Sequence, residues 1–338
     1  MKIRIFISRA LRAIFYFVFS RSRFTIGTLF NYFSKKRIAM TNVSVSDIKF
    51  KMFVDLDDYG VSRQLLLLKQ REYPNSSFVC DFIKENNKKI SSIVDIGANI
   101  GYYTLLIDQV FKQKINKDIN IYSIEPVPQS LSLLQSTILA LDRKNIKCIN
   151  TAIGGKDQEI VIAVPTRRNL SHIKGDVATI KMAMNHEEQN IRMTSLKTLF
   201  TENKIPTENI LFRYDIEGYE YHLIVENKEF IKSLKNVFII MEFHPFLLKK
   251  EEVYLFLNTL KELNFKLEKV VSCMPFYFIA TPLIFRNLLL KLWHWDKQND
   301  NLGYIPRIKT IDDLISEVGN TKSPIYTHPQ LHLYLSKE

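Results

Sequence analysis

The stretch Ile93-Val-Asp-Ile-Gly-Ala-Asn-Ile-Gly-Tyr-Tyr103 decides the fold. Its first four residues predict a short buried strand, and the glycines that follow predict a tight turn into a helix. Glycine at such a turn lets the backbone approach a ligand closely, and the next helix offers free N–H groups at its start. The stretch therefore indicates a nucleotide-type ligand, held where a strand of an open α/β sheet ends.

A second stretch, Leu211-Phe-Arg-Tyr-Asp-Ile-Glu-Gly-Tyr-Glu220, repeats this pattern further along the chain. It predicts another buried strand, followed directly by the acidic residues Asp215 and Glu217. Because ligands bind at the carboxyl ends of parallel strands, we expect Asp215 to flank the same crevice as Asp95. Together the two stretches indicate a cofactor with reacting groups beside it.

Strands and helices alternate through most of the chain. We expect strands at 93–96, 119–124, 147–152, 210–214, 236–243 and 331–335, and helices at 77–89, 102–111, 129–141, 219–228 and 250–263. This alternation predicts an α/β fold with a mostly parallel sheet and right-handed crossovers. Short strands at 159–164, 177–184 and 190–194 predict an antiparallel excursion, and further short strands are expected at 43–62.

Charge divides the chain unevenly. The first 46 residues hold nine of the 47 Lys and Arg and none of the 35 Asp and Glu, so the remainder carries a net charge of only +3. We therefore expect a basic amphipathic segment at 1–42 and a catalytic domain at 43–338. That domain comprises a core at about 78–270, a C-terminal insertion at about 271–326 and the last strand. No nucleic acid is expected as a partner, because the basic residues form an arm rather than a broad surface.

The N-terminal segment is helix-compatible, aromatic and basic. Its longest apolar run, Ala13 to Phe19, is far shorter than the ~18–20 residues that span a bilayer. We expect residues 1–33 to lie as an in-plane helix on an anionic membrane surface; a helix docked on its own domain is the alternative. The protein would then be cytoplasmic and peripheral on the inner face of the membrane. Three widely spaced cysteines without CxxC spacing agree with a reducing compartment.

The glycine spacing separates two cofactor classes. A dinucleotide site has G-x-G-x-x-G, whereas this chain has Gly97-x-x-x-Gly101. The preceding Asp95 suits a cationic ligand better than a pyrophosphate, and S-adenosylmethionine carries an amino group and a sulfonium centre. Glu125, before Pro126 at the end of the next strand, can accept both hydroxyls of a ribose. These features disfavour a nicotinamide-dependent dehydrogenase.

A group of candidate acid/base residues follows two strands further along. Asp215 and Glu217 follow one strand, and Glu242 and His244 lie at the carboxyl end of the other. Carboxylates and an imidazole at adjacent strand ends can move protons. Asp215, Glu242 and His244 could also hold a hard divalent cation, but their spacing does not require one, and we expect no resident metal.

Six motifs occur in one order: Val94-Asp-Ile-Gly-Ala-Asn-Ile-Gly-Tyr-Tyr-Thr104, Ile124-Glu-Pro126, Ala152-Ile-Gly154, Thr194-Ser-Leu196, Asp215-Ile-Glu-Gly-Tyr-Glu220 and Glu242-Phe-His-Pro245. They resemble the FkbM-type methyltransferases, a branch of the S-adenosylmethionine-dependent class I fold, over about residues 45–270 and the final strand. The resemblance implies a Rossmann-like, mostly parallel seven-stranded sheet with helices on both faces. It also implies O-methylation, commonly of hydroxyls on sugars or natural products.

The resemblance assigns roles to individual residues. Asp95, Gly97, Asn99 and Gly101 would cradle the methionine part of S-adenosylmethionine, Glu125 the ribose and Ala152 the adenine side, with Ala98, Tyr102 and Pro126 adjoining them. Asp215 and Glu217 would lie by the transferred methyl group. We expect Asp215 or His244 to be the base, with Glu217 and Glu242 orienting the reactants. The alternative is a membrane-associated binding module that keeps the fold without catalysis.

Overall fold

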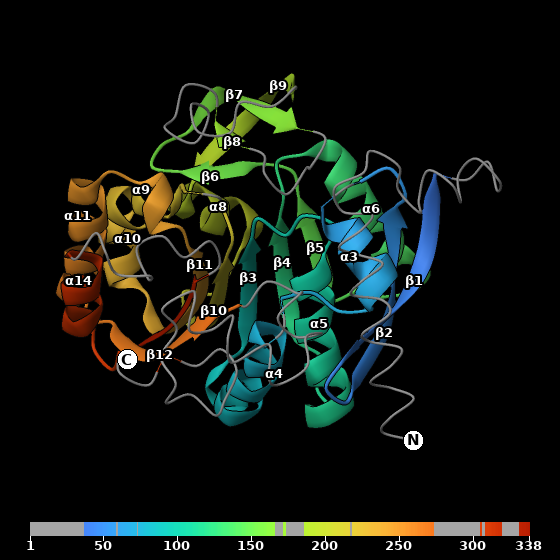
Figure 1. The fold of residues 1–338 in the computed structure, drawn as a ribbon, viewed down its shortest axis with the longest axis horizontal. Coiled ribbons are helices and arrows are strands. Elements are labelled where there is room, and N and C mark those ends of the chain that lie inside the picture. Colours follow the sequence, from blue (N-terminus) through green and yellow to red (C-terminus); the bar gives the residue numbers. More distant parts are fainter. Residues whose placement is uncertain are drawn as a thin grey trace, which may run out of the picture.

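A seven-stranded sheet forms the centre of the computed structural model, which describes residues 37–58, 60–72, 74–165, 172–173, 186–216, 218–273, 305, 308–319 and 331–338 (Figure 1). Its strand order is β12-β13-β11-β10-β3-β4-β5. The bounds are β3 Ser92–Ile96, β4 Asn120–Ile124, β5 Ile146–Ile149, β10 Glu208–Tyr214, β11 Lys235–Phe243, β12 Lys266–Ser272 and β13 Leu331–Lys337. β13 runs antiparallel to β11 and β12, and the other four neighbouring pairs are parallel, so the expected mostly parallel sheet is confirmed.

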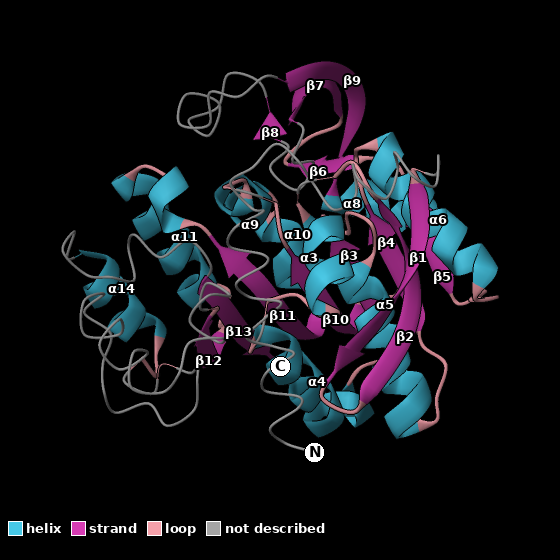
Figure 2. Cartoon of the chain, turned by 45° about the vertical axis from the view of Figure 1, so that its right-hand side comes forward, coloured by secondary structure: helices cyan, strands magenta, loops and turns pink. Residues whose placement is uncertain are grey.

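Helices cover both faces of the sheet (Figure 2). On one face lie α3 Val61–Leu68, α4 Asn75–Asn86, α5 Tyr102–Val110 and α6 Pro128–Ala140; on the other lie α8 Leu196–Asn203, α9 Glu220–Glu226, α10 Lys228–Ser233, α11 Lys250–Glu262 and α14 Ile311–Gly319. Along β3 and β10, Ile93 and Leu211 pack into the first layer, whereas Val94 and Phe212 pack into the second. This period of two explains why strands buried on both faces read as continuous apolar runs.

Two smaller sheets flank this core. The antiparallel pair β1 Ile38–Val45 and β2 Ile48–Asp55 packs on α5 and α6. A four-stranded sheet in the order β6-β9-β7-β8 lies beyond the large sheet at the top of Figure 1, with bounds β6 Ala152–Gly154, β7 Gln158–Pro165, β8 His172–Ile173 and β9 His186–Ser195. The antiparallel excursion is therefore present, although β6 pairs with β9 in parallel. The strand expected at 177–184 lies outside the described residues.

Three expected boundaries need correction. The single strand expected at 147–152 is two, because Asn150 leaves the ladder and its side-chain amide donates to the carbonyls of Glu125 and Pro126. Within the region expected to be an insertion at 271–326, β12 continues to Ser272 and α14 adds a helix to the core. The first strand begins at Ile38 rather than near residue 43.

Candidate functional site

The glycine loop, residues 97–101, lies directly against the end of β10. Ile96 and Tyr214 are partners in the parallel ladder, so Gly97 and Asp215 leave the sheet side by side. Gly97 has a φ of +80°, and a Cβ placed there would lie 2.0 Å from the Asp215 carbonyl oxygen. Only glycine permits both this conformation and this approach. The loop that we expect to hold a cofactor therefore touches the segment that we expect to react.

Glu125 ties the glycine loop to the end of β4. Its two carboxylate oxygens accept the backbone N–H groups of Asn99 and Val127, at 2.8 and 2.9 Å. Asn99 adopts the left-handed conformation, at a φ of 52°, and so turns its N–H toward this carboxylate. Burial raises the pKa of Glu125 to about 7, although both N–H donors oppose that rise. A carboxylate accepts up to about four hydrogen bonds, so capacity for ribose hydroxyls remains.

Asp95 lies beneath the loop, fully buried at the end of β3. Its Oδ2 accepts the Thr104 hydroxyl at 2.5 Å, and its Oδ1 lies 3.6 Å from Nη1 of Arg213. Burial raises the pKa of Asp95, although Arg213 and the Thr104 hydroxyl favour its ionised form. Asp95 thus supports the glycine loop from below, through the first turn of α5.

Arg213 connects the two motifs. Its guanidinium donates to the Gly97 carbonyl at 3.1 Å and to Oδ2 of Asp215 at 2.7 Å, and it stacks 4.3 Å from the centroid of the Tyr103 ring. Burial disfavours the Asp215 carboxylate, but Arg213, Arg71 and His244 together lower the pKa of Asp215 below its usual value. Asp215 is therefore a stable anion and a weak base near neutral pH.

A histidine between two carboxylates lies at the neighbouring strand end. His244 is 2% exposed, and its Nδ1 lies 2.6 Å from Oε1 of Glu220, the first residue of α9. Its Nε2 lies 3.5 Å from Oε1 of Glu242 at the end of β11. Burial and the nearby Asp215 and Glu72 raise the pKa of Glu242 to about 7. The arrangement fixes the imidazole and supplies a carboxyl group that exchanges protons near neutrality.

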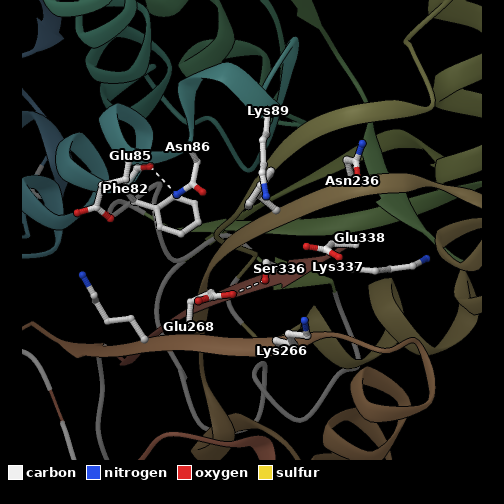
Figure 3. A pocket seen from close by; sticks show the side chains of 12 residues that line it. Phe82, Glu85, Asn86, Lys89, Asn236, Lys266, Glu268, Ser336, Lys337 and Glu338 are labelled. Atoms are coloured by element: carbon white, nitrogen blue, oxygen red, sulfur yellow. Dashed lines mark hydrogen bonds between the residues drawn. The ribbon is translucent and has the colours of Figure 1, made fainter.

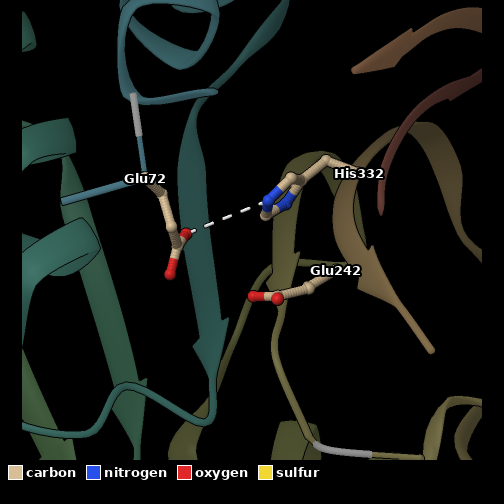
Figure 4. A group of neighbouring side chains, drawn as sticks. All are labelled: Glu72, Glu242 and His332. Atoms are coloured by element: carbon tan, nitrogen blue, oxygen red, sulfur yellow. Dashed lines mark ion pairs between the residues drawn. The ribbon is translucent and has the colours of Figure 1, made fainter. Parts of the chain in front are cut away.

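Two further segments complete this group of buried side chains. Arg71, between α3 and α4, pairs with the adjacent Glu72 and lies 3.9 Å from Oδ2 of Asp215. Glu72 also accepts the Tyr103 hydroxyl at 2.7 Å, and its Oε2 lies 4.0 Å from Nε2 of His332 on β13 (Figure 4). Burial lowers the pKa of His332 well below its usual value, so its ring is neutral. We call the connected set the charged cluster: Arg71, Glu72, Asp95, Arg213, Asp215, Glu220, Glu242, His244 and His332.

The remaining predicted residues lie at the edges of the site or outside the described residues. Ala98 packs on Leu131 and Leu134 of α6, and Ala152 packs beside Val127 in the turn after Glu125. Pro126 belongs to that same turn. The Tyr102 side chain points into the core, where its hydroxyl bonds Ser76 and the carbonyl of Arg71. Glu217 lies outside the described residues.

Sequence reasoning missed five members of the charged cluster: Arg71, Glu72, Arg213, Glu220 and His332. Glu220 ends the second quoted stretch, and its position at the start of a helix beside a strand end could have marked it. His332 opens the expected last strand, but only the register, which pairs it with Glu242, brings it to the site. Arg71 and Glu72 fall in a loop with no local signal of function.

A separate cavity lies at the opposite end of the parallel strands of the large sheet. It has a volume of about 330 Å³ and lies where β11 and β12 begin and β13 ends (Figure 3). Lysine and glutamate side chains make up much of its lining, among them Lys89, Lys266 and Glu268. Because the glycine loop lies at the carboxyl ends of the strands, this cavity is not part of the candidate site.

One known protein family matches the part of the chain that contains the glycine loop and the ends of β10 and β11. A sequence profile described as the methyltransferase FkbM domain matches residues 95–267, a span that runs from Asp95 of the glycine motif into β12. This chain belongs to the FkbM methyltransferase family. Its strand order, with one antiparallel strand inserted beside the edge, is that of the Rossmann-like class I methyltransferases. The family and fold expected from the sequence are therefore confirmed.

Solved structures resemble this chain at low identity. Methyltransferase FkbM from Methylobacillus flagellatus KT is 18% identical over 45% of this chain and 32% of its own length, with a TM-score of 0.29, so the match spans about a third of that protein. The structure titled StiE O-MT residues 961–1257 is 11% identical over 82% of this chain and 77% of its own, with a TM-score of 0.38. A precorrin-6y C5,15-methyltransferase from Geobacter metallireducens GS-15 is 8% identical over 77% and 88%, with a TM-score of 0.34. No curated protein matches the sequence.

Among the described residues, none of the helices combines the length and the apolar character that crossing a bilayer requires. The basic segment at 1–33, expected to contact an anionic membrane, lies outside those residues.

Proposed function

We propose that this methyltransferase uses S-adenosylmethionine to methylate a hydroxyl oxygen of a sugar, glycan or glycolipid-type acceptor. The observation that carries the proposal is the contact between the glycine loop and the segment after β10. Gly97 approaches the Asp215 backbone so closely that a cofactor held on the loop would lie beside the charged cluster. Cofactor binding and methyl transfer would then take place at the carboxyl ends of the same strands.

The residues present fit S-adenosylmethionine. Gly97 and Gly101 both have positive φ, and the loop between them leads into the start of α5. Glu125 would hold the ribose, with Asn99 and Val127 keeping its carboxylate in place. Ala152 would face the adenine side, since it packs next to that turn.

When bound, the cofactor would supply an electrophilic methyl group on a positively charged sulfur. Asp215 would remain ionised beside that charge, because Arg213 holds its carboxylate at 2.7 Å and keeps its pKa low. His244 would take the proton from the acceptor hydroxyl as the oxygen accepts the methyl group. Glu220 would hold Nδ1 of that imidazole, and Glu242 would stabilise its charged form at Nε2. Such a transfer depends chiefly on positioning.

The acceptor class rests on the family resemblance and on the basic N-terminal segment. A basic amphipathic arm at 1–33 would place the enzyme on the inner face of a membrane, close to lipid-linked glycans. Flotation with anionic vesicles tests this part: the full chain should float, and a chain that starts at residue 37 should not. Equal flotation of both would contradict membrane binding through this segment.

The transfer itself is tested with purified full-length protein, S-adenosylmethionine and a panel of glycan and glycolipid acceptors, with products identified by mass spectrometry. His244→Gln should lower kcat by roughly 100-fold or more, the usual contribution of a general base, while cofactor affinity stays unchanged. His222→Gln is the control, because that partly exposed histidine pairs with Glu226 and lies outside the charged cluster. Normal turnover in His244→Gln would contradict the base assignment. No product with any acceptor, together with no cofactor binding, would favour the binding module.

A further inference from the structure

The charged cluster contains more negative than positive groups. It holds five carboxyl groups and two guanidinium groups, with side chains at most 10% exposed: Glu72, Asp95, Asp215, Glu220, Glu242, Arg71 and Arg213. Contacts of 4.0 Å or less form two sets, and ligand atoms of Glu242 lie within 4.8 Å of atoms in both. An excess of three acidic groups away from water is unfavourable unless cations or protons compensate it. The guanidiniums are already engaged with Glu72, Asp95 and Asp215, which leaves Glu242 without a cationic partner of comparable proximity.

Two of the buried polar atoms without hydrogen-bond partners belong to Glu242 and His332, which are neighbours across the β11–β13 ladder. Oε2 of Glu242 and Nε2 of His332 have no hydrogen-bond partner among the residues that the structure describes, although their side chains are 5% and 2% exposed. Buried polar atoms are almost always satisfied, and a bound ion is one of the explanations for an exception, beside a water or a catalytic role. Glu242 and His332 are also partners in the β11–β13 ladder, so the backbone itself holds these side chains together.

Glu72 supplies a third ligand on the opposite side of the same space (Figure 4). One ligand atom from each of Glu72, Glu242 and His332 lies within 4.8 Å of the others, and Oε2 of Glu72 lies 4.0 Å from Nε2 of His332. Ligands bound about 2.0–2.2 Å from a shared ion lie up to roughly 4.4 Å apart, so small side-chain movements would complete coordination. We propose that Glu72, Glu242 and His332 bind a divalent first-row metal ion.

The ligand types specify the class of metal. Two carboxylates and an imidazole suit Mn²⁺, Fe²⁺ or Zn²⁺, whereas Mg²⁺ and Ca²⁺ prefer oxygen ligands alone. Groups around the ligands are also in place, because Glu72 accepts the Tyr103 hydroxyl and pairs with Arg71. Hydrogen bonds of this kind orient ligating carboxylates.

The neighbouring trio Asp215, Glu242 and His244 is the weaker candidate for the same ion. Its ligand atoms also lie within 4.8 Å of one another. However, both ring nitrogens of His244 already face carboxylates, those of Glu220 and Glu242, whereas Nε2 of His332 has no hydrogen-bond partner among the described residues. Glu242 belongs to both trios: its Oε1 faces His244, and its Oε2 is free for the ion at His332. The ion would therefore fix Glu242 beside the proposed base.

Metal content and affinity test the proposal without any methyl transfer. Full-length protein is purified without chelator and analysed by elemental mass spectrometry; metal-stripped protein is then titrated calorimetrically with MnCl₂ and with ZnCl₂. About one ion per chain is expected, with affinity lowered at least about tenfold in His332→Ala and in Glu72→Gln. His222→Ala, which removes an imidazole elsewhere, should bind as the wild type does.

Two results would overturn the site. One is a folded wild type that binds neither ion. The other is a His332→Ala variant whose metal affinity equals that of the wild type. If Asp215→Asn and His244→Gln abolish metal binding instead, the ion lies at the neighbouring trio and the proposed site is also wrong. If His332→Ala does not fold, the test uses wild-type protein loaded with Mn²⁺. Electron spin-echo spectroscopy then detects whether an imidazole nitrogen is bound to the ion. That nitrogen signal should persist in His244→Gln and in His222→Ala, and its loss in either would contradict the assignment to His332.

Discussion

The glycine loop and the charged cluster meet at the carboxyl ends of the parallel strands, but they are assembled differently. The loop is continuous in sequence, from Gly97 to Gly101, and two positive φ angles at its glycines define its shape. The cluster gathers side chains from β3, β10, β11, β13, the start of α9 and the loop after α3. A continuous motif can be recognised in isolation, whereas the cluster exists only once the sheet has formed. The loop should therefore respond to local backbone changes, and the cluster to loss of any one charge.

The largest effect should come from Arg213, which joins the two regions. Arg213→Met leaves Asp95 and Asp215 buried without their nearest cation, and removing one partner of a buried ion pair costs about 3–5 kcal/mol. Urea denaturation should show this loss in the free energy of unfolding. Arg213→Lys retains the positive charge, so its free energy of unfolding should lie between those of Arg213→Met and the wild type. Equal stability of wild type and Arg213→Met would mean that the charges are compensated in another way.

The next effect concerns Gly97. Gly97→Ala imposes a Cβ at a φ of +80° and 2.0 Å from the Asp215 carbonyl oxygen, so the two loops must separate. Such backbone strain costs about 1–3 kcal/mol of stability. S-adenosylmethionine affinity should fall at the same time, as measured by calorimetry. Ala98→Gly, which adds no atom, is the matched control and should bind the cofactor more tightly than Gly97→Ala.

A smaller effect should appear in the pH dependence of cofactor binding. Burial places the pKa of Glu125 at about 7, and we propose that its ionised form accepts the ribose hydroxyls. Affinity should therefore rise about tenfold between pH 6 and pH 8 as the ionised fraction grows. The raised pKa also means that this group favours folding less as pH rises from about 4.5 to 7, because the folded state holds its proton longer. Glu125→Gln should abolish the pH dependence of affinity, and a dependence that persists would assign it to another group.

The smallest effect is expected at the surface. Arg192 and Glu202 form an ion pair at 2.7 Å, with side chains 51% and 48% exposed. Exposed pairs contribute about 0–1 kcal/mol, so Arg192→Met should hardly change urea denaturation. A loss as large as that of Arg213→Met would show that burial does not explain the difference between the two arginines.

The sequence predicts the fold and the loop better than the cluster for physical reasons. Apolar runs and glycines mark β3, β10 and the turn after β3 within a few residues, because these signals are local. The strand break at Asn150 depends on bonds to Glu125 and Pro126, which no local pattern reveals. His332 is expected only as part of a last strand. Its place opposite Glu242 follows from β13 inserting between β11 and β12, and Arg71 and Glu72 reach the site through tertiary packing alone.

Calorimetric titration of the full chain with S-adenosylmethionine and S-adenosylhomocysteine tests the central claim most directly, using wild type, Glu125→Gln and His244→Gln. We expect micromolar binding to wild type, at least tenfold weaker binding to Glu125→Gln and unchanged binding to His244→Gln, because we propose that the loop binds the cofactor and that the cluster acts on the acceptor. Folded wild-type protein that binds neither compound, or a His244→Gln variant as impaired as Glu125→Gln, would contradict this division of roles.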